Sequence, residues 1–461
     1  MMQCVLLVFA SHINAQSTAQ WRGPERDGIY PETGLLKSWP EEGPELLFSS
    51  PDIGKGYSSG VYSQGVLYVT GMKDTMDYLT AIGEDGAILW QVAFGLAWED
   101  SFPDTRCTPT VEGDHIYVIS GMGEMACINT AGEILWKVDV DGLYESKWHI
   151  WGVSESPLIV DNMVLCSPVG EKASLVALDK NDGSLIWAAK PVRGRRSYAS
   201  PILYEYKDIR LILAKSSTDL FAVDPENGNV EWSFAYDQLM TYDEDEDEYE
   251  EEEEEEEDFE EEEEEYEEDE DEEEDEGEEE DEEEEEEDEE EDDPDFGLIF
   301  TNTPTFHKDE IFLTAGYDMT AVMLKLSPDG GSVSVKYTDH TFDNHFHGVV
   351  LVDGYLYGSN WYNNSKGRWV CMKWSTGEIK YVDEWKTKGN ILYADGLLYV
   401  YEERGTVGLV KPDKNAFEVI SSFRIREGKG PHWAHLSIYD GKLLVRHGNV
   451  LMVYDIQENP Q

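Results

Sequence analysis

Residues 175–187 read LVALDKNDGSLIW, and this short phrase occurs three more times along the chain. In each copy a small or apolar run leads into a turn that ends on glycine, and a tryptophan follows four residues after that glycine. The copies end at Trp90, Trp136, Trp187 and Trp232, which are 46, 51 and 45 residues apart. A repeat with a period of about 20–50 residues is the sequence signature of a propeller or a solenoid.

Each repeat unit is predicted to form four short β-strands. Upstream of the phrase lies a strand such as residues 108–111 (TPTV), then a turn, and then an apolar strand such as residues 115–119 (HIYVI). Asp-Gly, Ala-Gly and Asn-Gly steps between β-branched runs indicate hairpins, because glycine and asparagine adopt a positive φ at little cost. Four antiparallel strands make one blade, so the sequence predicts an all-β chain that folds as a β-propeller.

Eight positions are expected to begin the inner strands, and they predict eight blades: Gly60, Pro109, Pro157, Pro201, Pro304, Val349, Ile391 and Leu436. The last unit contains only three strands, between Leu436 and Tyr454, and residues 45–48 near the N-terminus are expected to supply its fourth. Such a closure removes free sheet edges from the ring. Seven blades is the alternative, because the seventh unit, which ends near Phe423, matches the phrase poorly.

The phrase resembles the quinoprotein-type (PQQ-like) propeller repeat, in which a Gly-x-x-x-Trp segment docks each outer strand onto its neighbour. Residues 20–29, QWRGPERDGI, are similar to the N-terminal segment of secreted bacterial members of that family, and the resemblance covers about residues 20–236 and 298–456. It implies a fold more than a function, because the family includes quinone-dependent alcohol dehydrogenases, the outer-membrane assembly factor BamB and many other secreted propellers.

The chain is expected to hold one domain, a propeller over residues 45–456, preceded by two short segments. Residues 1–15 are predicted to be a signal peptide, because an apolar core is followed by small residues suited to cleavage before Gln16. That core is too short to span a membrane. Residues 16–44 form an N-terminal segment that leads into the ring. The sequence therefore predicts export to the periplasm or the extracellular space, without a transmembrane segment.

Residues 243–295 form a polyanion inside an otherwise mildly acidic protein. This stretch contains 48 Asp and Glu residues and no Lys or Arg, whereas the rest of the chain has 52 acids against 34 bases, a net charge of −18. Its few apolar residues cannot offset the entropy of ordering, so a disordered insertion between blades 4 and 5 is predicted. A tolerated low-complexity expansion, loose binding of divalent cations and contact with a basic partner are the alternatives for its role. Its charge excludes nucleic acid as a partner.

The linkers from each outer strand to the next inner strand are rich in Arg, His and Trp, although the body of the protein is acidic. These linkers surround one mouth of the channel, which predicts a binding rim there. The predicted rim residues are Arg106, Trp148, His149, Trp151, Arg195, Arg196, His345, His347, Trp433 and His435. Neighbouring linker positions add Trp98, Arg193, His340, Trp385, Lys388 and His432. Planar indole and guanidinium groups suit sugars, aromatic quinones or acidic peptides. The structural alternative is that these tryptophans only cover the tops of the blades.

The quinone dehydrogenases that the repeat resembles hold their cofactor between a tryptophan and a ring made by adjacent cysteines, beside a calcium ion with carboxylate and amide ligands. This chain has no adjacent cysteine pair, because Cys107, Cys127, Cys166 and Cys371 are far apart in sequence. Oxygen ligands for a metal could come from Asp100, Asp104, Glu155, Asp343 and Asn344, which form no recognisable motif, and Glu155 is the best single candidate. Residues 54–60 (GKGYSSG) are interpreted as a Gly-rich rim turn and not as the nucleophile elbow of a serine hydrolase, because no helix is predicted after them.

The sequence therefore favours a monomeric, non-catalytic binding scaffold without a cofactor, whose partner is a protein, a glycan or a small molecule. One alternative is a dehydrogenase that uses PQQ and calcium to oxidise an alcohol or a sugar. The other is a carbohydrate-binding accessory protein that uses the tryptophan-rich rim.

Overall fold

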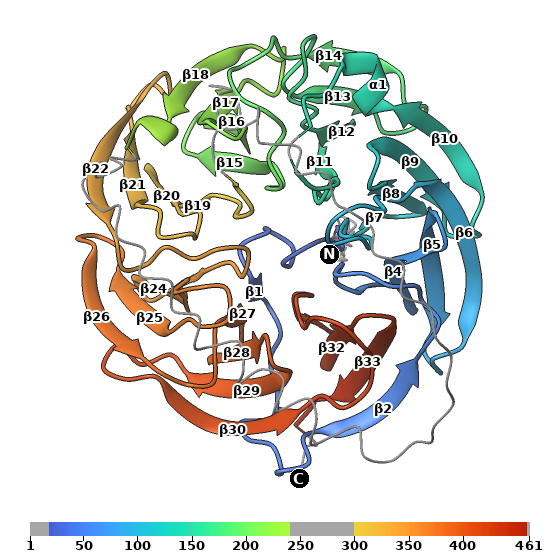
Figure 1. Cartoon of the computed structure of the whole chain (residues 1–461), viewed down its shortest axis with the longest axis vertical. Helices are drawn as coiled ribbons and strands as arrows, with labels where there is room; N and C mark the ends of the chain where they lie inside the picture. Colours follow the sequence, from blue (N-terminus) through green and yellow to red (C-terminus); the bar gives the residue numbers. More distant parts are fainter. Residues whose placement is uncertain (1–17, 149, 240–298, 459–461) are drawn as a thin grey trace, which may run out of the picture. The chain divides into compact units, whose positions relative to one another are not determined.

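A computed structural model describes residues 18–148, 150–239 and 299–458. In these ranges eight blades of four antiparallel strands stand side by side in a ring, which is an eight-bladed β-propeller (Figure 1). The structure confirms the all-β fold and the prediction of eight blades over the alternative of seven. The predicted signal peptide at residues 1–15 and the polyacidic insertion at residues 243–295 lie outside the described residues.

Within each blade the strands run from the centre of the ring outward. Blade 1 consists of β3 (Val61–Ser63), β4 (Val66–Lys73), β5 (Met76–Gly83) and β6 (Ile88–Leu96), and blade 2 consists of β7 (Thr110–Glu112), β8 (His115–Ile119), β9 (Glu124–Asn129) and β10 (Ile134–Asp139). Blade 3 consists of β11 (Leu158–Val160), β12 (Met163–Cys166), β13 (Val176–Asp179) and β14 (Leu185–Ala188), and blade 4 consists of β15 (Ile202–Tyr206), β16 (Ile209–Lys215), β17 (Asp219–Val223) and β18 (Val230–Ala235). Blade 5 consists of β19 (Thr305–His307), β20 (Glu310–Leu313), β21 (Ala321–Leu326) and β22 (Val333–Asp339), and blade 6 consists of β23 (Val350–Val352), β24 (Tyr355–Ser359), β25 (Trp369–Lys373) and β26 (Glu378–Asp383). Blade 7 consists of β27 (Gly389–Ala394), β28 (Leu397–Glu402), β29 (Thr406–Lys411) and β30 (Glu418–Arg424), and blade 8 consists of β31 (Ser437–Tyr439), β32 (Lys442–His447), β33 (Val450–Asp455) and β2 (Glu45–Ser50). The described ranges also contain one short helix, α1 (Val140–Tyr144), and a 3-10 turn at Asp237–Leu239.

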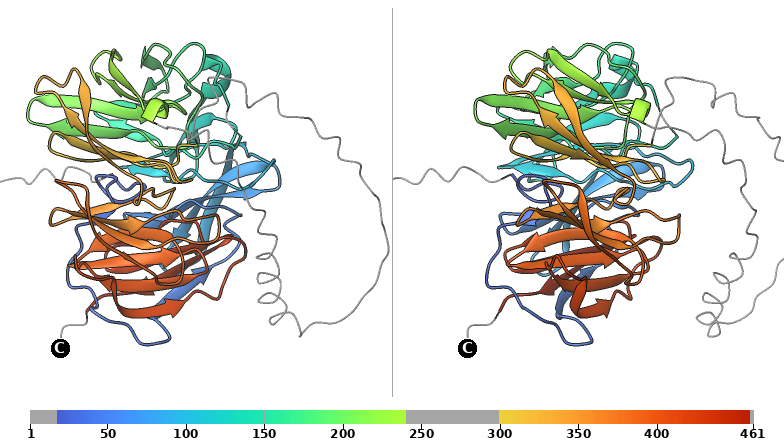
Figure 2. Two further views of the ribbon diagram at one scale, coloured as in Figure 1. Left: turned by 60° about the vertical axis from the view of Figure 1, so that its left-hand side comes forward. Right: turned by 90° about the vertical axis from the view of Figure 1, so that its left-hand side faces the viewer.

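The two ends of the propeller chain meet in blade 8. Strand β2 pairs antiparallel with β33, with Glu45 opposite Asp455 and Ser50 opposite Leu451. In the side views of Figure 2 the blue N-terminal strands accordingly lie beside the orange and red C-terminal strands. This pairing closes the ring with an N-terminal strand, as the three-stranded last repeat predicted.

The repeated glycine and tryptophan join neighbouring blades. Gly183 has a φ of +73°, and a Cβ atom placed on it would lie 2.8 Å from the ring of Trp136 in the preceding blade. The indole Nε1 of Trp136 donates a 3.2 Å hydrogen bond to the carbonyl oxygen of Lys180 in the same turn. Trp90 and Trp187 make the equivalent pair of contacts with the turns of the blades that follow them. The phrase that defines the repeat is therefore the contact that holds one blade to the next.

Replacing Gly183 with alanine is expected to lower the free energy of unfolding by about 2–4 kcal/mol, because the new methyl group meets the Trp136 ring in a left-handed backbone conformation. Gly396→Ala is the matched control, since Gly396 has a φ of +85° but no atom within 4 Å of a Cβ there. The control is expected to lose only about 1–2 kcal/mol from backbone strain. Urea unfolding of both variants measures the difference, and equal losses would contradict the inter-blade contact.

The centre of the ring is filled by the N-terminal segment (Figure 1). Ala19 pairs with Val111 of β7, and β1 (Ile29–Tyr30) adds in parallel to the inner strand β27. The hydroxyl of Tyr439 in β31 donates a hydrogen bond to the carbonyl oxygen of Gln20. Residues 19–30, which contain the QWRGPERDGI stretch, thus form a plug that contacts the inner strands of several blades.

Two arginines of this plug hold the inner ends of the blades through backbone carbonyl groups. Arg22 donates to the carbonyl oxygens of His347 at 3.3 Å and Val349 at 2.6 Å. Arg26 donates to those of Ser156 at 3.0 Å and Pro201 at 3.2 Å, and also to that of Pro157. Both side chains are buried, and neither forms an ion pair with another described residue. Burial lowers the pKa of each to about 10, so both remain charged at neutral pH.

Candidate ligand-binding site

The eight linkers that enter the inner strands converge on a cavity of about 590 Å³ at one mouth of the channel. Each linker contributes at least one lining residue, from Tyr57 before blade 1 to His435 before blade 8. Tyr317, Trp361 and Glu403 join the lining from the loops that precede β21, β25 and β29. We call this cavity the cup. It is built by the unrepeated parts of the sequence, whereas the repeats build the blades.

The plug contributes Trp21 to the lining of the cup. The Trp21 ring meets that of His435 edge-on, with 5.5 Å between the ring centroids. The adjacent Arg22 is anchored to the carbonyl oxygen of Val349. The N-terminal segment at the centre of the ring therefore forms part of the boundary of the cup.

Aromatic rings line most of the cup in one continuous series of contacts. Neighbouring ring centroids lie 4.5–6.0 Å apart in the order Tyr198, Trp151, Phe102, Trp433, Phe346, His345, Tyr317 and Trp361. The pairs are tilted or edge-on, the geometries that aromatic quadrupoles favour. The series gives the cup a stiff apolar wall that offers a flat ligand a large contact area.

Arg106 is a cation of the cup that forms no ion pair at contact distance within the part of the chain that the structure describes, although Asp77 and Asp104 lie near enough to attract it. Its guanidinium donates hydrogen bonds to the carbonyl oxygen of Phe102 and, at 3.4 Å, to that of Asp104. It also lies over the Tyr57 ring, 5.8 Å from the centroid. Burial lowers the pKa of Arg106, while the phenols of Tyr57 and Tyr198 and the nearby carboxyl groups oppose that shift. Its remaining N–H groups are available to an anionic ligand.

Lys388, the other cation in the lining, is already paired. Its Nζ lies 3.2 Å from Oε2 of Glu403 and donates a 2.9 Å hydrogen bond to the carbonyl oxygen of Asn363. The other carboxylate oxygen of Glu403 lies 3.0 Å from Nε2 of His347. Although burial acts in the opposite direction, His347 and Lys388 hold the pKa of Glu403 below its usual value. The pair therefore contributes little net charge to the cup.

His345 brings an unpartnered polar atom to the aromatic wall. His345 is only 8% exposed, and its Nε2 has no hydrogen-bond partner among the residues described. Burial, with smaller contributions from His347 and Lys388, lowers the pKa of His345 well below 6.5, so its imidazole is neutral at neutral pH. The hydroxyl of Thr301, which also lines the cup, is likewise buried without a described partner. A ligand that forms hydrogen bonds with such buried polar atoms removes the free-energy cost of leaving them unpaired.

Asp343 fixes the two loops that bring Tyr317 and Trp361 to the cup. One of its carboxyl oxygens accepts a 3.0 Å hydrogen bond from the backbone N–H of Asp318, and the other accepts a 3.1 Å bond from that of Trp361. Burial raises the pKa of Asp343 to about 8, against these hydrogen bonds. The carboxyl group thus positions an aromatic corner of the wall without itself lining the cavity.

Five of the ten residues predicted for the rim line the cup: Arg106, Trp151, His345, Trp433 and His435. His347 lies behind this lining, fully buried and bonded to Glu403. Lys388, from the neighbouring linker positions, also lines the cup. His149 lies outside the described residues.

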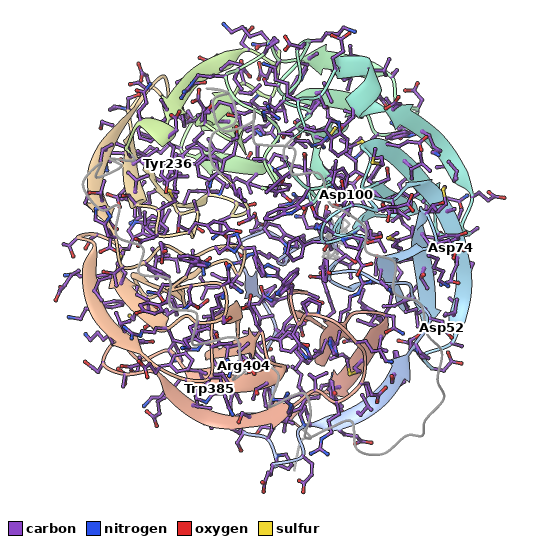
Figure 3. The ribbon with its side chains drawn as sticks, in the orientation of Figure 1. Asp52, Asp74, Asp100, Tyr236, Trp385 and Arg404 are labelled. Carbon is purple, nitrogen blue, oxygen red and sulfur yellow. The ribbon has the colours of Figure 1, made fainter. Side chains whose placement is uncertain are left out.

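Trp148 and Arg195 do not line the cup. Trp148 stacks on Trp98, with 5.8 Å between the ring centroids and 12° between the planes. Arg195 donates a 3.0 Å hydrogen bond to the carbonyl oxygen of Trp148. Trp385 lies away from the centre of the ring in Figure 3. Its ring packs between those of Trp369 and Phe417. For these tryptophans the structure shows the packing role that the sequence left open.

Arg196 and Glu155 form a buried ion pair behind the cup. Arg196 is 4% exposed and contacts Oε2 of Glu155 at 3.3 Å and the carboxylate of Asp141. Glu155 also accepts a 3.0 Å hydrogen bond from the backbone N–H of Ser167. Burial raises the pKa of Glu155 to about 7, against the attraction of Arg196. These contacts give Glu155, the candidate metal ligand, a structural partner.

Most of the aromatic wall was missed from the sequence. The missed lining residues are Trp21, Tyr57, Phe102, Tyr198, Tyr317, Phe346 and Trp361. Phe102, Tyr198 and Phe346 lie in the same linkers as the predicted residues, so tyrosine and phenylalanine in those linkers were a usable signal, whereas Tyr57 lies in the linker before blade 1, from which no rim residue was predicted. Tyr317 and Trp361 come from different loops, and only the fold brings them to the cup.

The cup does not match the quinone-and-calcium site that the resemblance implied. The four described cysteines are all buried and unpaired, and none lines the cavity. Glu403 is the single carboxylate among the described lining residues, and Lys388 and His347 already bind it. No group of three or more His, Cys, Asp or Glu side chains in the described ranges is placed to hold a metal ion. A hard cation such as calcium needs several oxygen ligands, which these residues do not assemble.

Comparison with known proteins supports the fold and the repeat. A family model described as "Outer membrane protein assembly factor BamB" matches residues 75–241. A search of curated proteins finds no match. The structure is similar to that of BamB from Moraxella catarrhalis, with 13% sequence identity, a TM-score of 0.55 and coverage of 90% of this chain and 98% of that one.

Two dehydrogenases share the fold at similar distance. A europium-containing methanol dehydrogenase has 10% identity and a TM-score of 0.59, and covers 92% of this chain and 88% of its own. The quinohemoprotein alcohol dehydrogenase from Comamonas testosteroni has 10% identity and a TM-score of 0.59, with coverage of 95% of this chain and 80% of that one.

The helices of the described residues are all too short or too polar to cross a membrane. The chain is therefore an eight-bladed β-propeller whose residues 75–241 are similar to the repeat of the BamB family model.

Proposed function

We propose that this protein is an exported, non-catalytic propeller that binds a ligand in the cup. The observation that carries the proposal is the convergence of all eight linkers on one cavity whose wall is aromatic and whose Arg106 guanidinium has no described ion-pair partner. A concave, largely apolar site with a few convergent polar groups is the usual form of a small-molecule site.

A binding role fits the state of the titratable groups in the cup better than a catalytic role does. Glu403 is held ionised by Lys388 and His347, and His345 is held neutral by burial. None of these groups is paired with a nucleophilic side chain in the lining. General acid–base catalysis needs a group within hydrogen-bond reach of the reacting atoms and poised near the working pH. The name of the matched family, an assembly factor, supports a binding role, and a protein segment is the alternative occupant.

Calorimetric titration of the purified protein tests the proposal with oligosaccharides, aromatic acids, acidic peptides, and PQQ together with calcium. We expect one class to bind, and Trp433→Ala to weaken that binding at least tenfold by removing a central ring of the wall. Leu135→Ala is the control, because Leu135 is 45% exposed on the outer strand β10. Equal affinity of both variants would contradict binding in the cup. A new visible absorbance with PQQ and calcium, with dye-linked oxidation of an alcohol, would favour the dehydrogenase.

A further inference from the structure

The geometry points to an acidic oligosaccharide, one that contains a uronic acid residue, as the ligand of the cup. This inference rests on the proposed binding function and adds the chemical class of the ligand. Three features of the described residues carry it: one guanidinium without an ion-pair partner, an aromatic wall, and buried polar atoms that lack partners.

The guanidinium selects a carboxylate. Arg106 uses two of its donors on the carbonyl groups of Phe102 and Asp104 and has no ion-pair partner in the described ranges. Lys388 is bound by Glu403, so Arg106 provides the net positive charge of the lining. A guanidinium with free N–H groups in a half-enclosed apolar site binds carboxylate through paired, charge-assisted hydrogen bonds.

The aromatic wall selects a ligand with flat apolar faces. Tyr57 and Phe102, next to Arg106 in space, both contact the Trp433 ring, with centroids 5.0 and 6.0 Å away. A carboxylate held by Arg106 therefore places the rest of its ring against these side chains. A pyranose ring suits such a surface because its C–H bonds carry a partial positive charge that the negative face of an aromatic ring attracts.

The unpartnered polar atoms distinguish a sugar from an aromatic acid. Nε2 of His345 and the hydroxyl of Thr301 are buried in the lining without a described partner. An aromatic ring offers these atoms no hydrogen-bond partner and leaves them unpaired, as they are in the free protein, whereas a hydrogen bond from the ligand recovers about 1–3 kcal/mol for each group. Sugar hydroxyl groups donate and accept, so they satisfy a neutral imidazole in either tautomer.

The positions of these groups indicate more than one sugar ring. Arg106 lies in the linker between blades 1 and 2, and His345 lies in the linker between blades 5 and 6, on the opposite side of the ring (Figure 1). A ligand that reaches both must span the cup, whose volume of about 590 Å³ accommodates a short oligosaccharide. The class is therefore an oligosaccharide with one ring carboxylated.

The test titrates the full protein with oligomers of galacturonate, glucuronate, mannuronate and guluronate, and with their methyl esters, which keep the rings and remove the charge. We expect at least one acid to bind about tenfold or more tightly than its ester. Arg106→Met is expected to abolish that preference, and Arg106→Lys to retain part of it. Arg404→Met is the matched control, because Arg404 is an exposed cation that does not line the cup (Figure 3).

His345→Phe gives a second, independent readout. It removes the unpartnered nitrogen but keeps a ring in the wall, so acid and ester are both expected to bind more weakly while their ratio is unchanged. Binding of neutral sugars or aromatic acids with no preference for uronates would overturn this inference and leave the binding function standing. If no ligand of any class bound, or if Trp433→Ala changed no affinity, the proposed function would fail with it.

Discussion

Replacing Arg26 with methionine is expected to lower the free energy of unfolding by about 3–5 kcal/mol, because it leaves several buried carbonyl groups without a donor. Arg26 donates to carbonyl oxygens of Ser156, Pro157 and Pro201, at the inner ends of blades 3 and 4, and its Nε donates to Oε1 of Gln20 at 2.8 Å. One side chain thus joins the plug to two blades. Methionine fills similar space but donates nothing.

Chemical unfolding followed by tryptophan fluorescence measures this effect. Glu25→Met is the matched control, since Glu25 is the exposed neighbour in the same segment. The control is expected to change the stability by less than about 0.5 kcal/mol, as surface substitutions usually do. If Arg26→Met unfolded at the same denaturant concentration as the control, the plug would not contribute to the stability of the ring.

Replacing Lys215 with methionine is expected to raise the free energy of unfolding by about 3–5 kcal/mol at pH 6. Lys215 ends β16 and is only 2% exposed, with Nζ 4.5 Å from the centroid of the Phe300 ring and 3.5 Å from the carbonyl oxygen of Thr314. No described carboxylate pairs with it. Burial therefore lowers the pKa of Lys215 from 10.5 to about 7.

The pH dependence follows from the direction of that shift. Below pH 7 the ammonium is charged in both states, and its burial opposes folding in full. Between pH 7 and 10.5 the unfolded chain binds a proton that the folded protein does not, so the stability of the wild type rises with pH by up to about 1.4 kcal/mol per unit from this group. The advantage of Lys215→Met should accordingly shrink as the pH rises.

Urea unfolding of wild type and variant at pH 6 and pH 9 tests this prediction, because the difference between the two proteins cancels the titration of other groups. Lys190→Met, at an exposed linker position, is the control and should show no such trend. A difference between wild type and Lys215→Met that stays constant between the two pH values would contradict a neutral buried amine.

The candidate site was predicted from the sequence only in part, and its residues show why. Arg106, Trp151, His345, Trp433 and His435 were found because cations, histidines and tryptophans in linkers stand out against an acidic background. The same criterion also selected Trp148 and Arg196, which pack and pair behind the cup. The direction in which a linker side chain points depends on neighbouring blades that are far away in sequence.

The plug illustrates the same limit. The QWRGPERDGI stretch was recognisable as a family-like N-terminal segment, yet nothing local in it indicates that Arg26 contacts residues about 130 and 175 positions away. Its arginines find carbonyl groups only because the ring brings the ends of several inner strands together. Trp21 reaches the cup for the same reason.

The sequence by itself determined the blade, favoured eight blades over seven and predicted the closure by residues 45–48, because these depend on a local pattern of strands and turns that repeats along the chain. The resemblance to the quinoprotein-type repeat implied that Gly-x-x-x-Trp joins neighbouring blades, and the structure shows the glycine with a positive φ against an aromatic ring of the preceding blade. The tertiary structure alone decided which linker residues face the cup and which polar atoms lack partners. Those properties belong to contacts between segments that share no local pattern, so they exist only once the ring has closed.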